Sequence, residues 1–189
     1  MMRALVVGRS RGAMDEYRAA RALCPYDFVI VIGKMGEVFP DRIDYWVSFH
    51  ANLFDKWAAT RAANGHPPAA HYWGAVHKGR RLGEAATHCS PISFVPSVGG
   101  SSGFVAAQGA LRELAVDRVV LAGIPMSAEE SHFADASTAR EAAGTWSEAG
   151  MYWATWEDHM PEMLGRVKSM SGRTRVALGA PTRAWLEGL

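Results

Sequence analysis

Two short, uninterrupted apolar runs, each followed by a glycine, constrain the fold of this chain most. Residues 4–7 (Ala-Leu-Val-Val) precede Gly8, and residues 27–32 (Asp-Phe-Val-Ile-Val-Ile), which are apolar from Phe28 onward, precede Gly33. Strands that are covered on both faces, as in a parallel sheet, are apolar at successive positions instead of alternating. Residues 14–23 between them have a helical composition, with acidic residues in the first turn and a proline beyond the end. The chain therefore opens with a predicted right-handed βαβ unit.

The later segments extend this pattern. Further strands are predicted over residues 44–49, 72–76, 92–95, 119–122 and 175–178, and helices over 52–63, 104–114, in pieces over 137–170, and as a closing turn over 182–186. Residues 78–87 have no clear pattern, and residues 124–136 are polar and loop-like. We predict one α/β domain over residues 1–189. It is expected to be a single-domain Rossmann-like three-layer sandwich with a mostly parallel sheet and a helical C-terminal part at about 137–170.

Composition narrows the class of protein. Hydrophobic residues make up 49% of the chain and charged residues 21%, as in soluble globular proteins, and the net charge of +1 does not indicate nucleic acid as a partner. No apolar run approaches the length of a membrane span, and the apolar run after Arg3 is too short for a signal peptide. We therefore expect a cytoplasmic protein that does not contact membranes. The two cysteines do not indicate a disulfide scaffold. The sequence leaves open whether the protein forms a homo-oligomer.

A small-residue turn, Gly99-Gly100-Ser101-Ser102-Gly103, precedes the helix predicted over residues 104–114. It has two interpretations. Ser101 or Ser102 can simply cap the helix. Alternatively, the serine hydroxyls and the free N–H groups of the first turn can hold an anion such as a phosphate, which glycine allows to approach the backbone closely.

The turn Gly8-Arg9-Ser10-Arg11-Gly12 follows the first strand and also has more than one interpretation. It can act as a phosphate loop in which the two arginines supply positive charge, or the arginines can point into solvent. It also fits the Gly-x-Ser-x-Gly pattern of a nucleophile elbow, with Ser10 as nucleophile. That elbow normally follows several earlier strands, whereas here it follows the first. The phosphate loop is therefore favoured.

Ligands of open parallel sheets bind beyond the carboxyl ends of the strands, where these turns should converge. The candidate ligand-binding residues are Gly8, Arg9, Ser10, Gly12, Ser101, Ser102, Gly103 and Gly123. Their chemistry suits a phosphorylated small molecule, a nucleotide or nucleotide-sugar, and no tightly bound cofactor is expected. The chain lacks a Walker A motif and an Asp-x-Asp pair. The spacing of His71, His77, His88 and Cys89 fits no zinc pattern, so we predict no metal site.

His132 and His159 are the candidate catalytic residues. His132 follows Glu129-Glu130-Ser131, and His159 follows Glu157-Asp158. A histidine can act as a general base near neutral pH, and an adjacent carboxylate can orient it; the alternative is a surface or hydrogen-bonded side chain. Trp146, Trp153 and Trp156 recur at helical spacing, which favours core packing over a platform for a sugar or base.

The order of these segments resembles a known group. Val6-Val7-Gly8, Phe28-Val29-Ile30-Val31 and Ile43-Asp44-Tyr45-Trp46-Val47 resemble the opening of the Rossmann-like bacterial sialyltransferases. Ser102-Gly103-Phe104-Val105-Ala106-Ala107 and Val119-Val120-Leu121-Ala122-Gly123-Ile124 resemble their second nucleotide-binding segment. The archaeal pterin pyrophosphokinase-like domain has similar signatures, and the short chain resembles small phage-encoded proteins.

The resemblance implies a cytidine nucleotide held by Gly8, Ser10, Ser102 and Gly103, with His159 or His132 as the general base and no metal. The chain departs from the family where Arg9 and Ile32-Gly33 replace asparagines and Pro125 replaces an acidic residue. We therefore expect a metal-independent, glycosyltransferase-like transferase that binds a nucleotide or nucleotide-sugar. A non-catalytic nucleotide-binding or assembly module of the same fold is the alternative, and a serine hydrolase using Ser10 is third.

Overall fold

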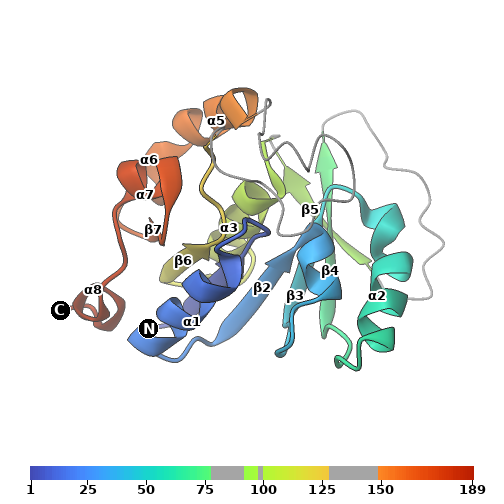
Figure 1. The fold of residues 1–189 in the computed structure, drawn as a ribbon. Helices are drawn as coiled ribbons and strands as arrows, with labels where there is room; N and C mark the ends of the chain where they lie inside the picture. Colours follow the sequence, from blue (N-terminus) through green and yellow to red (C-terminus); the bar gives the residue numbers. More distant parts are fainter. Residues whose placement is uncertain (78–91, 98–99, 128–148) are drawn as a thin grey trace.

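A sheet of parallel strands runs through the middle of the molecule (Figure 1), in a computed structural model that describes residues 1–77, 92–97, 100–127 and 149–189. The described strands are β1 (Arg3–Val7), β2 (Phe28–Ile32), β3 (Tyr45–Ser48), β4 (His71–His77), β5 (Ile92–Ser97), β6 (Arg118–Ala122) and β7 (Val167–Ser169). Their order across the sheet is β5-β4-β3-β2-β1-β6-β7, and each described pairing is parallel. The predicted α/β class is confirmed, and a sheet expected to be mostly parallel is parallel throughout its described strands.

Helices cover both faces of this sheet (Figure 1). The described helices are α1 (Ala13–Leu23), α2 (Phe54–Ala63), α3 (Ser102–Arg112), α5 (Ala149–Asp158), α6 (Met160–Met163), α7 (Gly172–Leu178) and α8 (Arg183–Glu187), with 3-10 turns η1 (Gly33–Glu37) and η2 (Ala51–Leu53). Side chains of α3, α5, α6 and α7 belong to one buried cluster, and those of α1, η1, α2 and α8 to a second. The three-layer arrangement predicted from the apolar strands is therefore present.

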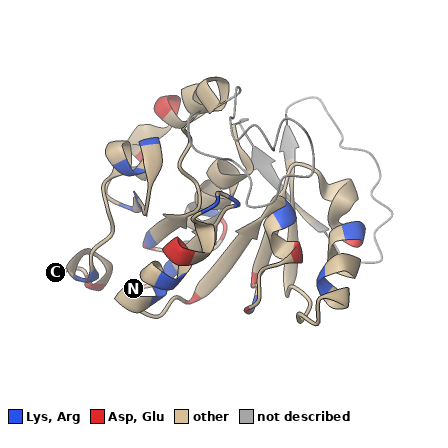
Figure 2. Cartoon of the chain, viewed as in Figure 1, with Lys and Arg blue, Asp and Glu red and all other residues tan. Residues whose placement is uncertain are grey.

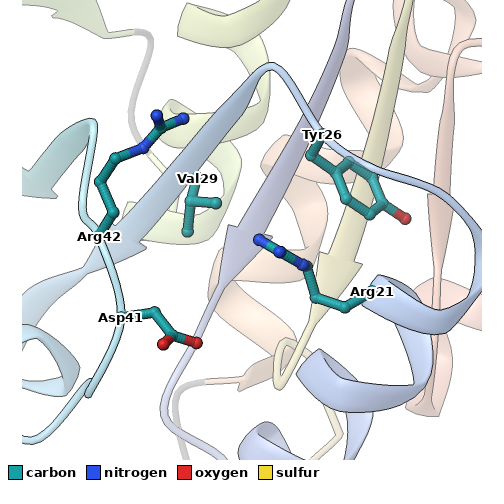
Figure 3. Close-up of a pocket in the computed structure, with 5 residues that line it drawn as sticks. All are labelled: Arg21, Tyr26, Val29, Asp41 and Arg42. Atoms are coloured by element: carbon teal, nitrogen blue, oxygen red, sulfur yellow. The ribbon is translucent and has the colours of Figure 1, made fainter.

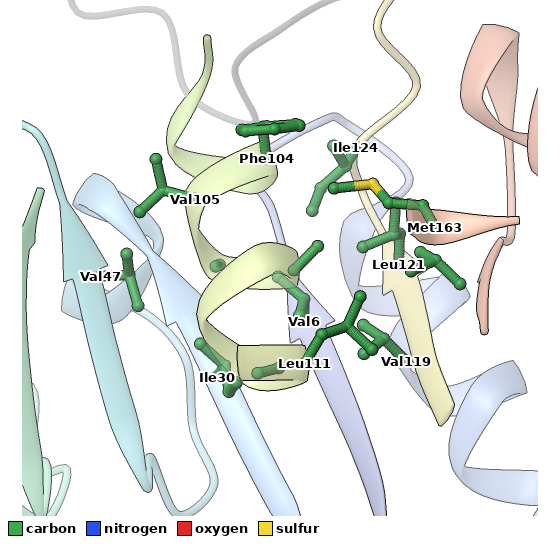
Figure 4. Packing of buried hydrophobic residues seen from close by; sticks show 14 of the residues in the cluster. Val6, Ile30, Val47, Phe104, Val105, Leu111, Val119, Leu121, Ile124 and Met163 are labelled. Carbon is green, nitrogen blue, oxygen red and sulfur yellow. The ribbon is translucent and has the colours of Figure 1, made fainter. Parts of the chain in front are cut away.

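The central strand β1 shows why uniformly apolar runs were needed. Ala4 and Val6 belong to the cluster under α3, whereas Leu5 and Val7 belong to the cluster under α1, and all four are fully buried. Successive side chains of a strand point to opposite faces, so a strand covered on both sides favours apolar residues at every position. Figure 4 shows Val6 among the side chains packed between α3 and the sheet.

The connections create a topological switch point at β1. From β1 to β5 the chain adds strands in one direction, and α3 then returns it so that β6 pairs with the other side of β1. The chain leaves β1 toward the face covered by α1, and it leaves the neighbouring strand β6 toward the face covered by α5 and α6. In open α/β sheets this is where a crevice for a ligand forms.

A buried arginine connects α2 to η1 and to the loops before β3 and β4. Arg61 in the last turn of α2 is only 1% exposed, and burial lowers the pKa of its guanidinium. Its nitrogens donate hydrogen bonds to four backbone carbonyl oxygens, those of Gly36, Phe39, Asp41 and Pro67. The charge is therefore stabilised by carbonyl dipoles, which satisfies a group that is very costly to bury alone.

The C-terminal region differs from the sequence prediction. Residues 137–170 were expected to be helical in pieces, and α5 and α6 agree, but Val167–Ser169 form strand β7. Residues 175–178 were expected to be a strand and instead belong to α7. The reason is burial at helical spacing: Thr174 and Leu178 are buried, four residues apart, while Val176 between them is 88% exposed. Strand β7 was not predicted because Lys168 interrupts its apolar pattern.

Two further predictions concern the same part of the chain. Trp153 and Trp156 are buried in the cluster under α3, which confirms core packing for these two members of the tryptophan stripe. Trp146 lies outside the described residues, as do residues 78–87, 128–136 and 137–148. The closing helical turn predicted over residues 182–186 is confirmed by α8.

Candidate functional site

The turn after β1 is joined directly to the end of β6. The Gly8 amide donates to the carbonyl oxygen of Ala122 over 2.7 Å, and the Ser10 amide donates to that of Gly123 over 3.3 Å. A Cβ atom on Gly8 would lie 2.1 Å from the Gly123 carbonyl oxygen and 2.6 Å from the Ile124 side chain. Glycine is therefore required at position 8 by the close approach of the protein's own backbone.

A carboxylate occupies the space between this turn and β6. Glu16, in the first turn of α1, accepts a hydrogen bond from the Gly123 amide over 2.6 Å. Gly123 has a φ of +68°, and a Cβ there would meet Ala13 at 2.5 Å. Negative charge is favourable at a helix N-terminus, so Glu16 supplies at α1 the charge that a bound phosphate would supply. The acidic first turn of this helix is visible in the sequence, but its contact with Gly123 was not predicted.

The serine turn lies against the same residues from the other face of the sheet. Ser101 is the N-cap of α3, and its hydroxyl oxygen accepts from the Phe104 amide over 3.3 Å and from Trp156 Nε1 over 3.4 Å. A Cβ on Gly103 would lie 2.9 Å from the Ile124 side chain. The capping interpretation is confirmed for Ser101. Ser102, the half-exposed first residue of α3, stays a predicted anion ligand.

Both turns therefore converge on residues 122–124, as the topology predicts. A third small-residue turn joins them there. Thr174 in α7 donates from its hydroxyl to the Ile124 carbonyl oxygen over 2.6 Å and lies 2.8 Å from the Ser169 hydroxyl. Gly172, with a φ of +64°, has no room for a Cβ because Pro125 lies 2.4 Å from that position. This turn was not predicted, because residues 169–170 were expected to be helical and residues 171–172 were assigned to no element.

The arginines of the β1 turn lie at the same edge, where Figure 2 shows basic residues along the loop that enters α1. Arg9 is half-exposed and Arg11 exposed, whereas the side chain of Ser10 is only 5% exposed. A nucleophile elbow presents its serine to solvent at the top of the sheet. The burial of Ser10 therefore gives the hydrolase interpretation no support, and Gly12 serves as the N-cap of α1.

Helix α5 brings His159 beside the serine turn. A Cβ on Gly100 would lie 3.1 Å from the Thr155 side chain, and Trp156 contacts Ser101 as described. One turn further, the His159 ring lies 5.6 Å from the Phe104 ring, measured between centroids. His159 thus stands next to the first two turns of α3, with 26% of its side chain exposed. His132 lies outside the described residues.

The carboxylate nearest His159 is not one of those adjacent in sequence. Nδ1 of His159 lies 3.4 Å from a carboxylate oxygen of Glu162, whose other oxygen accepts a hydrogen bond from Arg112 of α3. The Arg112 bond, followed by His159, holds the pKa of the Glu162 carboxyl below its usual range. Glu157, which was expected to orient His159, pairs instead with Arg173 over 3.4 Å.

The carboxylate at position 162 could have been found from the sequence. It stands three residues after His159, a spacing that places side chains on one face of a helical turn. The carboxylates expected to orient His159 were its neighbours in sequence, and neighbouring residues of a helix point to different faces.

Two cavities lie away from the candidate site at the carboxyl end of β1. One of about 390 Å³ is lined by Arg21, Tyr26, Val29, Asp41 and Arg42, at the amino ends of β2 and β3 (Figure 3). The other, of about 280 Å³, lies between α3 and α6 and includes Arg112 and Glu162 in its lining. The second cavity therefore borders the carboxylate that contacts His159.

Within the described part of the chain, no three His, Cys, Asp or Glu side chains gather in a group that could hold a metal ion. His88 and Cys89 lie outside those residues. None of the described helices has both the length and the apolar composition needed to cross a bilayer.

Comparison of the chain with family models, curated proteins and solved structures found no match. The resemblance to the Rossmann-like sialyltransferases and the pterin pyrophosphokinase-like domain therefore stays a prediction from short motifs.

Proposed function

We propose that the protein binds a nucleotide or nucleotide-sugar at the carboxyl edge of β1 and β6 and acts as a glycosyltransferase-like transferase. The single observation that carries this proposal is the convergence of the serine turn and the β1 turn on residues 122–124, at the switch point of a parallel sheet. This is the position at which doubly wound folds bind nucleotides. The partner is a phosphorylated small molecule.

The geometry favours the start of α3 as the phosphate-binding end. Ser102 is half-exposed at the first position of an 11-residue helix with no acidic residue in its first turn. The start of α1, by contrast, has Asp15 and Glu16 in its first turn, and Glu16 already fills the position next to Gly123. An anion is therefore stabilised by the α3 dipole and repelled at α1. Of the two predicted bases, His159 lies within the described part of the chain, beside α3, and we assign it the role of accepting a proton from an acceptor hydroxyl.

Thermal unfolding in the presence of nucleoside mono- and diphosphates and sugar nucleotides tests the proposal. A ligand at 100 times its dissociation constant should stabilise the native state by about 2.7 kcal/mol. Ser102→Asp should abolish this stabilisation by placing a like charge at the site, without destabilising α3. Thr182→Asp, which adds the same charge at the distant N-cap of α8, is the matched control and should retain binding. Absence of stabilisation by every ligand in the wild-type protein would overturn the proposal.

A non-catalytic nucleotide-binding module is the second candidate, and the Glu16–Gly123 contact favours it. It leaves one of the two turns filled by the protein's own carboxylate. This candidate expects His159→Ala to bind the nucleotide as the wild type does and to leave all function intact. A sugar nucleotide that the wild type turns over and that His159→Ala binds but does not turn over would exclude it.

A further inference from the structure

A chain of polar contacts, which matches no sequence motif, joins His159, Glu162 and Arg112. Glu162 lies between the other two, with one carboxylate oxygen toward Nδ1 of His159 and the other toward Arg112. The three side chains come from the start of α6 and from the last turn of α3, so tertiary packing sets their spacing. Arg112 and Glu162 line the cavity of about 280 Å³ between these helices, and both side chains are exposed.

The direction of each hydrogen bond follows from the chemistry of the groups. An arginine guanidinium has donors only, and an ionised carboxylate has acceptors only. Arg112 favours the ionised form of Glu162, consistent with the lowered pKa of that carboxyl. In the neutral imidazole, the ring nitrogen of His159 that faces Glu162 is then the donor, which leaves the other ring nitrogen as the acceptor.

We propose that Glu162 is a positioning residue that holds neutral His159 in the tautomer with its proton on Nδ1 and the lone pair on Nε2. Arg112 acts through Glu162 by keeping the carboxylate ionised and in place. A neutral histidine side chain in water prefers the opposite tautomer, with the proton on Nε2. The contact therefore selects the tautomer that is less favoured in water, and protonation of Nδ1 is the measurable sign of the contact.

The consequence for chemistry rests on the proposed function. With Nδ1 protonated, Nε2 is the atom that takes the proton of an acceptor hydroxyl. The acceptor oxygen then bonds to the transferred group as the bond to the nucleotide breaks, and the nucleotide leaves with that electron pair. A carboxylate on Nδ1 stabilises the imidazolium that forms.

Nitrogen NMR of the imidazole tests the tautomer in the free protein and needs no substrate. Spectra are recorded at about pH 8.5, some two units above the ordinary histidine pKa of about 6.5. The His159 signals are assigned by their loss in His159→Asn. We expect a protonated Nδ1 and an unprotonated Nε2 in the wild type.

Glu162→Gln is the decisive variant because it keeps the shape and changes only the donors. Arg112 requires an acceptor, so the amide oxygen turns toward Arg112 and the amide nitrogen faces His159 and donates to Nδ1. The His159 proton should then move to Nε2. Glu157→Gln, which changes a carboxylate that pairs with Arg173 instead, is the matched control and should leave the tautomer unchanged.

A wild-type His159 protonated on Nε2, or a tautomer that Glu162→Gln leaves unchanged, would overturn this inference. The outcome is independent of the ligand experiment. Failure to bind any nucleotide would remove the proposed function while leaving the tautomer result to stand or fall by itself.

Discussion

The amide of Gly123 donates a hydrogen bond of 2.6 Å to the carboxylate of Glu16, which connects the end of the sixth strand to the first turn of the first helix. The contact is made at the switch point, where parallel α/β proteins place their ligands. It shows that a carboxylate of the chain itself complements one of the two helix N-termini at this edge.

Removal of this carboxylate should destabilise the protein. In Glu16→Ala the Gly123 amide loses its acceptor, and α1 loses a negative charge at its N-terminus, so we expect a loss of about 1–3 kcal/mol in the free energy of unfolding. Urea denaturation measures it. Asp15→Ala is the control, because Asp15 is exposed and forms its ion pair with Arg18 at the surface, and its cost should stay below about 1 kcal/mol. Equal effects of the two substitutions would contradict the assignment.

Addition of a single methyl group at Gly8 should be far more costly than the same change at the unobstructed Gly150. The new Cβ would lie 2.1 Å from the Gly123 carbonyl oxygen, which is backbone and cannot move aside, so Gly8→Ala should cost about 3 kcal/mol or more. Gly150→Ala is the matched substitution: nothing lies within 4 Å of its Cβ position in α5. It should stabilise the helix by about 0.5–1 kcal/mol. Chemical denaturation of both variants decides the matter.

Arg61 should contribute to stability through its hydrogen bonds to backbone carbonyls. Arg61→Leu leaves the carbonyl oxygens of residues 36, 39, 41 and 67 without this buried donor, and we expect a loss of at least about 3 kcal/mol. Arg18→Leu, on the exposed surface of α1, should change the free energy of unfolding by less than about 1 kcal/mol. A tolerated Arg61→Leu would mean that these carbonyls find other partners.

Tyr17 should make the stability depend on pH in the alkaline range. Burial, together with its 2.7 Å hydrogen bond to Asp41, raises the pKa of Tyr17 to about 12. In the unfolded chain the phenol titrates near its ordinary pKa of about 10, so between these values the unfolded state binds fewer protons than the native state. The contribution of Tyr17 is therefore complete below about pH 10 and is lost as the pH rises to about 12.

Comparison with Tyr17→Phe isolates this effect from other groups that titrate at high pH. The difference in unfolding free energy between wild type and variant should be constant from about pH 7 to about pH 9.5 and then shrink, by at most about 1.4 kcal/mol per pH unit. Urea denaturation at a series of pH values measures it. A difference that stays constant up to pH 12 would show that Tyr17 titrates alike in both states.

The sequence predicted the parallel sheet and most of its elements for a definite reason. Residues 4–7 and 28–32 are apolar at successive positions because both faces of the sheet are covered, so the sequence alone shows which residues are buried. Val176 and Lys168 show where this reasoning fails. Strand β7 contains the polar residue Lys168, and helix α7 ends in an apolar run that includes the exposed Val176. The composition of each segment therefore predicts the wrong element, and the correct one depends on how the segment packs against the sheet.

The candidate site shows the same division. The glycine and serine turns were found from their residues, because small residues before a helix have few structural explanations. Glu16 and Glu162 were not, because each contact depends on where a second element lies: β6 for Glu16 and α3 for Glu162. The sequence by itself determined which strands are buried and where the turns are. Tertiary structure alone decided that Gly8 and Gly103 are required by the protein's own backbone and side chains, since close approach of distant segments leaves no local pattern.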